Sequence, residues 1–153
     1  LLSGSGGYGF VCCIDNLISR NKGGKSFIHL QDSETLCVPS VVGGGNGAEP
    51  VPIATHVVCA SAGGRILTFD ITELKAMEKG GRGLMLIDLE AKDSLAGAAA
   101  YTRSISLLGV GRGGKDRDET LEIRSLNNAR AARARKGKAA DLGFKPTHIV
   151  RVE

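Results

Sequence analysis

Short apolar runs with glycine pairs beside them are the main pattern of this chain. Residues 8–14, 65–71 and 104–110 are rich in apolar, β-branched and aromatic side chains. Runs of this length between turn residues predict strands and not helices. Leu1-Leu2 and residues 26–30 are predicted to be further strands. The sequence therefore predicts an all-β fold.

The sequence repeats at an offset of 57 residues, which is the separation of Lys22 and Lys79. One register without gaps aligns glycine pairs, basic loops and apolar stretches. The matches are Lys22-Gly23-Gly24-Lys25 with Lys79-Gly80-Gly81-Arg82, Lys79-Gly80 with Lys136-Gly137, Gly6-Gly7 with Gly63-Gly64, Leu17 with Leu74, and Phe27-Ile28 with Leu84-Met85. A strand-rich repeat of this length is typical of propeller blades.

Each unit is predicted to run as a strand, a Gly-Gly hairpin, a longer strand, a turn around a leucine, a basic glycine-rich loop and another strand. Glycine suits these turns because it adopts positive φ without steric cost. We expect about three four-stranded blades, at approximately residues 1–52, 53–98 and 99–153. Because a propeller-like ring usually has about four blades or more, we expect part of a larger ring that leaves an apolar blade face exposed.

Boundaries between the units are predicted from composition. Pro39, Pro50 and Pro52 flank the glycine-rich linker 43–47 and place the first boundary near Pro52. The second boundary is expected at residues 92–100, an Ala/Gly-rich run with weak strand preference.

The third unit departs most from the repeat. Residues 115–119 mix acidic and basic side chains and are predicted to form a turn. Residues 127–140 have high helix propensity, but the repeat register places them over the turn and basic loop of the other units. We therefore expect one or two helical turns that lead into a loop.

The composition is globular, with 42% hydrophobic and 24% charged residues. No apolar run is long enough for a membrane span and no signal peptide is recognisable, so we expect a cytoplasmic protein. The four cysteines show no CxxC spacing and are expected to be reduced and buried. His29, His56 and His148 lie far from any second ligand at metal-site spacing, so we predict no metal site.

Positive charge is concentrated in the last third of the chain. Residues 1–100 carry 8 lysines and arginines against 10 acidic residues, whereas residues 101–153 carry 12 against 6. The net charge is therefore −2 in the first part and +6 in the second. A basic surface of this kind attracts polyanions, above all the phosphates of nucleic acids.

Motifs for nucleotide binding and catalysis lack their structural context. GxGxxG occurs at residues 4–9 and 109–114, but a predicted strand follows the first and a charged turn the second, where the fingerprint needs a helix. Gly24-Lys25-Ser26 lacks the earlier glycine of a P-loop, since that position is Ser19. No spacing of serine, histidine and acidic residues indicates a triad. We predict no catalytic site and no cofactor in this chain.

The basic glycine-rich loops remain as the candidate binding site. Three loops in repeat register would lie on the same rim of the blades, where backbone N–H groups and cationic side chains can hold phosphates. Few aromatic residues lie between the charges, which favours double-stranded over single-stranded DNA. The predicted contacts are Arg20, Lys22, Lys25, Arg65, Lys79, Arg82, Arg130, Arg133, Arg135, Lys136 and Lys138. The predicted mode is sequence-independent binding of a curved duplex.

The chain resembles the C-terminal DNA-binding domain of the A subunits of bacterial type IIA topoisomerases, a β-pinwheel, with the topoisomerase IV branch the most similar. The resemblance lies along the whole chain, and residues 1–90 carry it most strongly. The residues that carry it are Gly7-Tyr8-Gly9-Phe10-Val11-Cys12, Asn16-Leu17, Arg20-Asn21, Gly24-Lys25, Gly64-Arg65-Ile66-Leu67 and Ile149-Val150-Arg151-Val152-Glu153.

The resemblance implies a fragment of about three blades that binds and bends DNA and presents a transport segment for relaxation and decatenation of chromosomes. Its partners would be double-stranded DNA, the ATPase B subunit, and the rest of the A subunit. The breakage tyrosine and the Mg²⁺ and ATP sites of the family lie outside this domain. The implied location is the nucleoid.

Two alternatives stay open. In the gyrase branch a Gln-Arg-Arg-Gly-Gly-x-Gly box supports DNA wrapping, and residues 78–83 keep only its Gly-Gly pair and final glycine. The other alternative is a propeller-type scaffold for protein interactions, whose basic loops are merely solvated.

Overall fold

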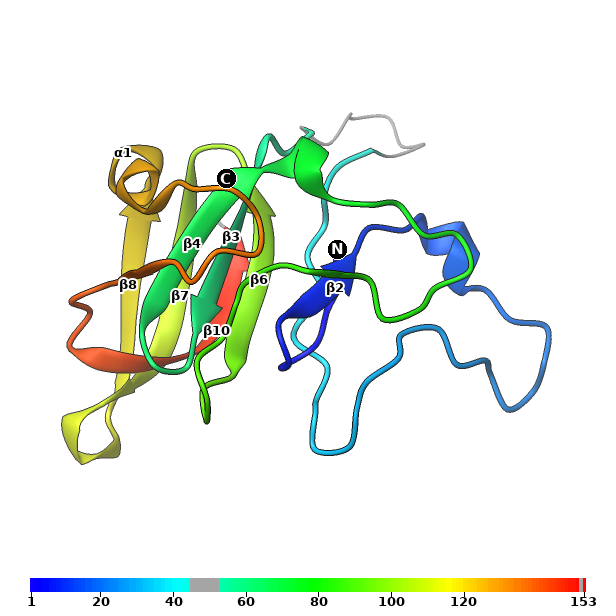
Figure 1. Cartoon of the computed structure of the whole chain (residues 1–153), viewed down its shortest axis with the longest axis horizontal. Coiled ribbons are helices and arrows are strands. Elements are labelled where there is room, and N and C mark those ends of the chain that lie inside the picture. Colours follow the sequence, from blue (N-terminus) through cyan, green and yellow to red (C-terminus); the bar gives the residue numbers. More distant parts are fainter. Residues whose placement is uncertain (45–52, 152) are drawn as a thin grey trace.

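The chain folds into a row of antiparallel sheets (Figure 1). The computed structural model describes residues 1–44, 53–151 and 153. The expected boundary at Pro52 and most of the linker 43–47 lie outside the described residues. The described residues form three sheets, as the predicted all-β class requires.

The first sheet contains β1 (Leu2–Ser3), β2 (Tyr8–Phe10) and β5 (Leu84–Met85), in the order β1-β2-β5. Residues 36–40 lie along the other side of β1, because the amide of Cys37 donates to Ser3 O (2.9 Å) and the amide of Ser40 donates to Leu1 O (3.0 Å). This sheet therefore has four adjacent backbone segments although only three are regular strands.

The second sheet contains β3 (His56–Ser61), β4 (Arg65–Asp70), β6 (Leu95–Tyr101) and β9 (Lys138–Ala139), in the order β6-β3-β4-β9. The third sheet contains β7 (Ser104–Gly111), β8 (Asp116–Glu122) and β10 (Phe144–Arg151), in the order β10-β7-β8. The long hairpin strands 65–71 and 104–110 are thus confirmed with small changes at their ends.

Each of the first two sheets takes an outer strand from the next sequence unit. β5 comes from the second sequence unit and pairs with β2 of the first, with Tyr8 opposite Met85. In the same way β9 comes from the third unit and pairs with β4 of the second, with Arg65 opposite Ala139. The sheets are therefore offset from the sequence units, because each of the first two sheets is completed by the next stretch of chain.

Short helical turns lie between the sheets. They are η1 (Ile14–Leu17), η2 (Ile71–Glu73), η3 (Arg112–Gly114), α1 (Ile123–Leu126) and η4 (Asn127–Ala129). The first two begin 57 residues apart, which confirms the predicted turns at the leucines. The last two confirm the predicted helical turns of the third unit, although they begin earlier than residue 127.

Four sequence expectations differ from the structure. Residues 92–100, expected to have weak strand preference, contain most of β6. Small side chains let this edge strand pair with β3 and pack closely on β10 of the third sheet: a Cβ on Gly97 would stand 3.1 Å from the Ile149 nitrogen. Residues 115–119, expected to form a turn, lie almost entirely in β8, since the chain reverses earlier, at Gly113 and Gly114 with φ of 77° and 75°.

The other two differences concern predicted strands of the first unit. The strand expected over residues 8–14 ends at Phe10, because Val11 bridges in parallel to Ala76 and Ile14 enters η1. Residues 26–30 contain one isolated bridge, Ile28 to Gly81, instead of a strand. In both segments the backbone pairs with the second unit, and the local sequence pattern does not predict such a distant partner.

The core has two layers, one on each face of the second sheet. Val57, Cys59, Leu67 and Phe69 face the first sheet, where they pack with Leu1, Leu86 and Ile87. The intervening residues Val58, Ala60 and Ile66 face the third sheet and pack with Ile105, Leu107 and Leu126. Successive side chains of a strand point to opposite faces, so one sheet supplies both layers.

Candidate nucleic-acid interface

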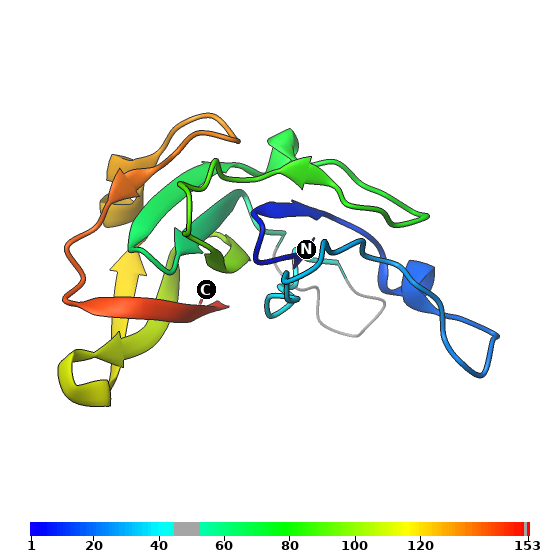
Figure 2. The ribbon, with the colours of Figure 1, turned by 60° about the horizontal axis from the view of Figure 1, so that its bottom comes forward.

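The three basic loops lie in chain order along one outer edge of the molecule (Figure 2). We call residues 20–25 loop 1, residues 79–83 loop 2 and residues 133–138 loop 3. Loop 2 is tied to the chain after loop 1, because the amide of Gly81 donates to Phe27 O (2.8 Å) and the amide of His29 donates to Gly81 O (2.9 Å). The predicted common rim is therefore visible in the fold.

Loop 3 is attached to the second unit by the same kind of contact. The amide of Ala134 donates to Leu86 O (2.9 Å), and the amide of Asp88 donates to Arg135 O (3.0 Å). Backbone hydrogen bonds thus fix the order and spacing of the loops.

Glycine allows loops 2 and 3 to lie flat on the preceding unit. Gly80 and Gly137 have φ of 74° and 75°. A Cβ on Gly80 would overlap the carbonyl of Phe27, and a Cβ on Gly137 would stand 2.6 Å from Ile66 O. Gly80 and Gly137, which are matched by the repeat, thus both lie against the preceding unit. A side chain at either position would prevent this close contact, which explains why both are glycine.

Most of the predicted contact residues are exposed. The exposed side chains lie on the three loops or, for Arg130, just before loop 3, and are Arg20, Lys22, Lys25, Lys79, Arg130, Arg135, Lys136 and Lys138. Lys25 Nζ lies 5.4 Å from the centre of the Phe27 ring, and this contact leaves its charge at the surface. These exposed cations therefore belong to the loops of this edge or to the segment just before loop 3.

Three predicted contact residues are engaged within the protein instead. Arg82 donates to both carboxylate oxygens of Glu34, at 3.0 and 2.9 Å, and its guanidinium carbon lies 4.1 Å from the centre of the Tyr8 ring. The hydrogen bonds from Arg82 lower the pKa of Glu34, and the same contact raises the pKa of Arg82. This pair joins the second unit to the first.

Arg65 and Arg133 connect the second unit to the third. Arg65 donates to Gly137 O (3.2 Å) and to Glu90 Oε1 (3.1 Å). Arg133 donates to Met85 O (2.6 Å), and its own amide donates to Glu73 Oε1 (3.1 Å). Sequence reasoning missed these roles because every partner lies at least 25 residues away in the chain.

Two further exposed cations extend the basic edge. Lys75 follows η2 on the way to loop 2, and Arg124 lies in α1 shortly before Arg130. The sequence could have indicated both, because each is a basic residue a few positions before a predicted contact.

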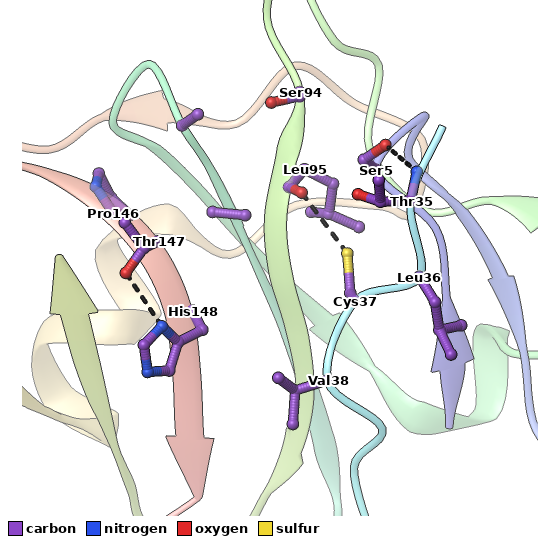
Figure 3. A pocket seen from close by; sticks show the side chains of 12 residues that line it. Ser5, Thr35, Leu36, Cys37, Val38, Ser94, Leu95, Pro146, Thr147 and His148 are labelled. Atoms are coloured by element: carbon purple, nitrogen blue, oxygen red, sulfur yellow. Dashed lines mark hydrogen bonds between the residues drawn. The ribbon is translucent and has the colours of Figure 1, made fainter. Parts of the chain in front are cut away.

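A hollow of about 460 Å³ lies away from the basic loops, between residues 35–38, β6 and β10 (Figure 3). Its described lining carries no lysine, arginine or carboxylate. Within it Cys37 Sγ lies 3.5 Å from Leu95 O, and Thr147 Oγ1 lies 2.9 Å from His148 Nδ1. Burial raises the pKa of the Cys37 thiol, so this group is a poor nucleophile. The described lining thus offers no lysine or arginine to hold a phosphate.

The cysteines are all free thiols. Cys37 and Cys59 are buried, as expected, and burial raises the pKa of both. The expectation is wrong for Cys13, which is exposed because it precedes η1 at the outer end of the first sheet, and Cys12 is only partly buried. In the described part of the chain, no three His, Cys, Asp or Glu side chains are grouped to hold a metal ion.

Over the residues that the structure describes, no helix has both the length and the apolar character needed to cross a membrane.

Comparisons of sequence agree with the architecture. A family model described as the DNA gyrase C-terminal domain, beta-propeller, matches residues 55–101. The A subunit of DNA topoisomerase 4 from Neisseria gonorrhoeae is 32% identical over 139 residues, covering 90% of this chain and 17% of that protein. The Haemophilus influenzae protein of the same name is 28% identical over 148 residues, covering 94% and 18%. The chain thus spans less than a fifth of the length of these relatives.

Solved structures share the fold. The C-terminal domain of Escherichia coli ParC superposes with a TM-score of 0.73 at 23% identity, over 97% of this chain and 58% of that chain. The C-terminal domain of DNA gyrase A gives 0.70 at 15% identity, over 99% and 48%. The predicted β-pinwheel class and the predicted resemblance are confirmed.

Proposed function

We propose, from this likeness to the C-terminal domains of topoisomerase IV A subunits, that the chain is a non-catalytic domain that binds and bends duplex DNA. The observation that carries the proposal is the row of three basic loops along one outer edge. Their exposed cations belong to successive units that follow a curved path. A duplex that follows them would be held through its phosphates and would curve with the edge.

In the intact enzyme the domain would present a transport segment for strand passage, in relaxation and in decatenation of daughter chromosomes. Its partners are proposed to be double-stranded DNA, the ATPase B subunit, and the remainder of the A subunit. Mg²⁺ and ATP would act elsewhere in that enzyme. The proposed location is the cytoplasm, on the nucleoid.

Sequence-independent binding follows from the chemistry of the edge. Lysine, arginine and glycine N–H groups recognise phosphate, which every sequence presents alike. The described loops carry Phe27 as a neighbour but no row of aromatic rings on which unpaired bases could stack. The edge therefore suits a duplex backbone.

A salt titration of duplex affinity tests the proposal. Fluorescence anisotropy with a duplex of roughly 40 base pairs, from about 50 to 300 mM salt, should give a linear loss of log affinity with log salt and a slope of several units. Lys136→Glu with Lys138→Glu should weaken binding to all sequences alike and reduce the slope. Lys145→Glu, an exposed lysine of β10 outside the loops, is the control with the same type of charge reversal.

Two outcomes would count against the proposal. If the wild-type chain does not bind a duplex at the low end of the salt range, the loops are solvated surface and the scaffold alternative is favoured. The second outcome is that Lys145→Glu weakens binding by as much, for each charge reversed, as the double change at Lys136 and Lys138. Affinity would then depend on the net charge of the chain and not on the basic edge.

The gyrase alternative rests on the similar fold of the gyrase A C-terminal domain and on the family model that carries its name. Wrapping would require a duplex much longer than the edge, and supercoil-dependent binding by the intact enzyme distinguishes it from simple bending.

A further inference from the structure

A partly buried ion pair joins the first two units at the centre of the basic edge. Glu34 belongs to the first unit and Arg82 to loop 2 of the second. Their side chains are 13% and 29% exposed, which is low for an acidic and a basic residue. The Tyr8 ring covers one face of the guanidinium, and two parallel hydrogen bonds fix its orientation. We call this cluster the inter-unit lock.

The acidic partner of the lock is itself held rigidly. The amide of Gln31 donates to Glu34 Oε2 (3.1 Å), and the amide of Ser5 donates to Thr35 O (2.8 Å). Gly6 lies beneath the carboxylate, since a Cβ there would overlap Glu34 Oε1. The first hairpin therefore presents a fixed carboxylate to loop 2.

The lock competes with DNA for Arg82. Each terminal nitrogen of Arg82 donates one N–H to Glu34, so the end of the guanidinium that could hold a phosphate with both nitrogens is occupied by a carboxylate of the same charge. The two backbone hydrogen bonds of Gly81 lie next to the lock and attach loop 2 to the first unit. The inter-unit lock therefore lies at the contact that fixes the distance between loops 1 and 2.

The second junction shows the same design with different residues. Arg65, the repeat counterpart of Tyr8, binds a carbonyl of loop 3 and Glu90. Asp93 lies over the second hairpin as Glu34 lies over the first, and its Oδ1 accepts from the amides of Gly63 (2.9 Å) and Ser94 (2.8 Å). Loops 2 and 3 are therefore each held by a side chain of the preceding unit.

We propose that Arg82 is a positioning residue and not a phosphate contact: with Glu34 and Tyr8 it sets the spacing of loops 1 and 2 and thereby the bend of the bound duplex. This inference rests on the proposed function. It reassigns one of the cations that the sequence placed at the DNA.

The variant Glu34→Gln distinguishes the effect of the inter-unit lock on loop spacing from the effect of net charge on DNA binding. The change makes the chain more positive by one unit, so electrostatics alone would strengthen DNA binding. The lock instead predicts that the duplex bends less, measured as a fall in energy transfer between fluorophores on the two ends of a duplex of roughly 40 base pairs, while the salt slope is not reduced. Arg82→Lys should give the same loss of bend at constant charge, since lysine has no fork.

Asp93→Asn is the matched control. It adds the same charge at the corresponding place of the second unit, and an asparagine oxygen can still accept the two amide hydrogen bonds. The bend should stay as in the wild type. If Glu34→Gln and Arg82→Lys also keep the wild-type bend, or if Arg82→Glu lowers the salt slope while the bend persists, Arg82 contacts phosphate and the proposal is wrong.

Hydrogen exchange without DNA keeps the lock separate from the proposed function. In Glu34→Gln the amides of Gly81 and His29 should exchange several-fold faster, while the amide of Cys59 in β3 stays unchanged. Unchanged exchange at Gly81 and His29 overturns the lock. If the two amides exchange faster in Glu34→Gln but the wild type binds no duplex, the Glu34–Arg82 pair still joins the first two units. Only its role in bending DNA would then be wrong.

Discussion

Gly80 shows how a single position can be constrained by a neighbouring unit. Its φ of 74° and the overlap that a Cβ would make with the Phe27 carbonyl both require glycine. Gly23 stands at the corresponding position of the first unit, where a Cβ would meet nothing within 4 Å. Glycine is therefore required by packing at position 80 but not at position 23.

Gly80→Ala is expected to destabilise the chain by at least about 1 kcal/mol, because alanine is strained at positive φ and its methyl group pushes loop 2 away from Phe27. Urea unfolding followed by circular dichroism measures the change. Gly23→Ala is the control and should stay within about 0.5 kcal/mol of the wild type. Equal effects of the two changes would show that loop 2 is not pressed against the first unit.

At the scale of elements, the second sheet holds the molecule together because both of its faces are buried. Phe69 of β4 is fully buried in the layer toward the first sheet, and Ile66 lies in the layer toward the third. Thr68 uses its hydroxyl for Val57 O (2.9 Å) and for the Tyr101 hydroxyl (2.6 Å), so the polar group in this strand is satisfied. β8, by contrast, is an exposed edge strand lined with charges, a common protection against pairing with other chains.

Phe69→Ala is expected to cost about 3–5 kcal/mol of folding free energy, since a large ring is removed from a packed layer. The midpoint of urea unfolding reports the loss. Ile14→Ala, which shortens a side chain that is 79% exposed, should leave the midpoint nearly unchanged. A similar cost for both would mean that the first layer is loosely packed.

At the scale of the whole molecule, the units are joined in a curved row whose first member has apolar side chains exposed at η1. Ile14 and Ile18 are 79% and 65% exposed, whereas Ile71 and Leu74 of the second unit pack against the first core layer. The curve of the row depends on the junctions, of which the Glu34–Arg82 pair is the most sheltered ion pair in the described residues.

Acid should weaken the first junction. The pKa of Glu34 is lowered from 4.5 in the folded chain, chiefly by its hydrogen bonds to Arg82, so its contribution to stability is present above that value and is lost as the pH falls through the lowered pKa. The difference in melting temperature between the wild type and Glu34→Gln should therefore shrink between pH 7 and pH 3. A difference that stays constant over this range would show that the charge of Glu34 adds nothing to stability.

Local chemistry determined much of this protein from sequence alone. Glycine pairs and apolar runs predicted the hairpins, the strands from Arg65 and Ser104, the turns at the leucines and the three basic loops, because each depends on residues that are adjacent in the chain. The internal repeat then predicted that the loops share an edge. Only the tertiary structure decided which strands complete which sheet, that the alanine-rich run forms β6, and that Arg82 binds Glu34. These outcomes depend on contacts between units, where residues far apart in the chain meet and local patterns carry no record of the partner.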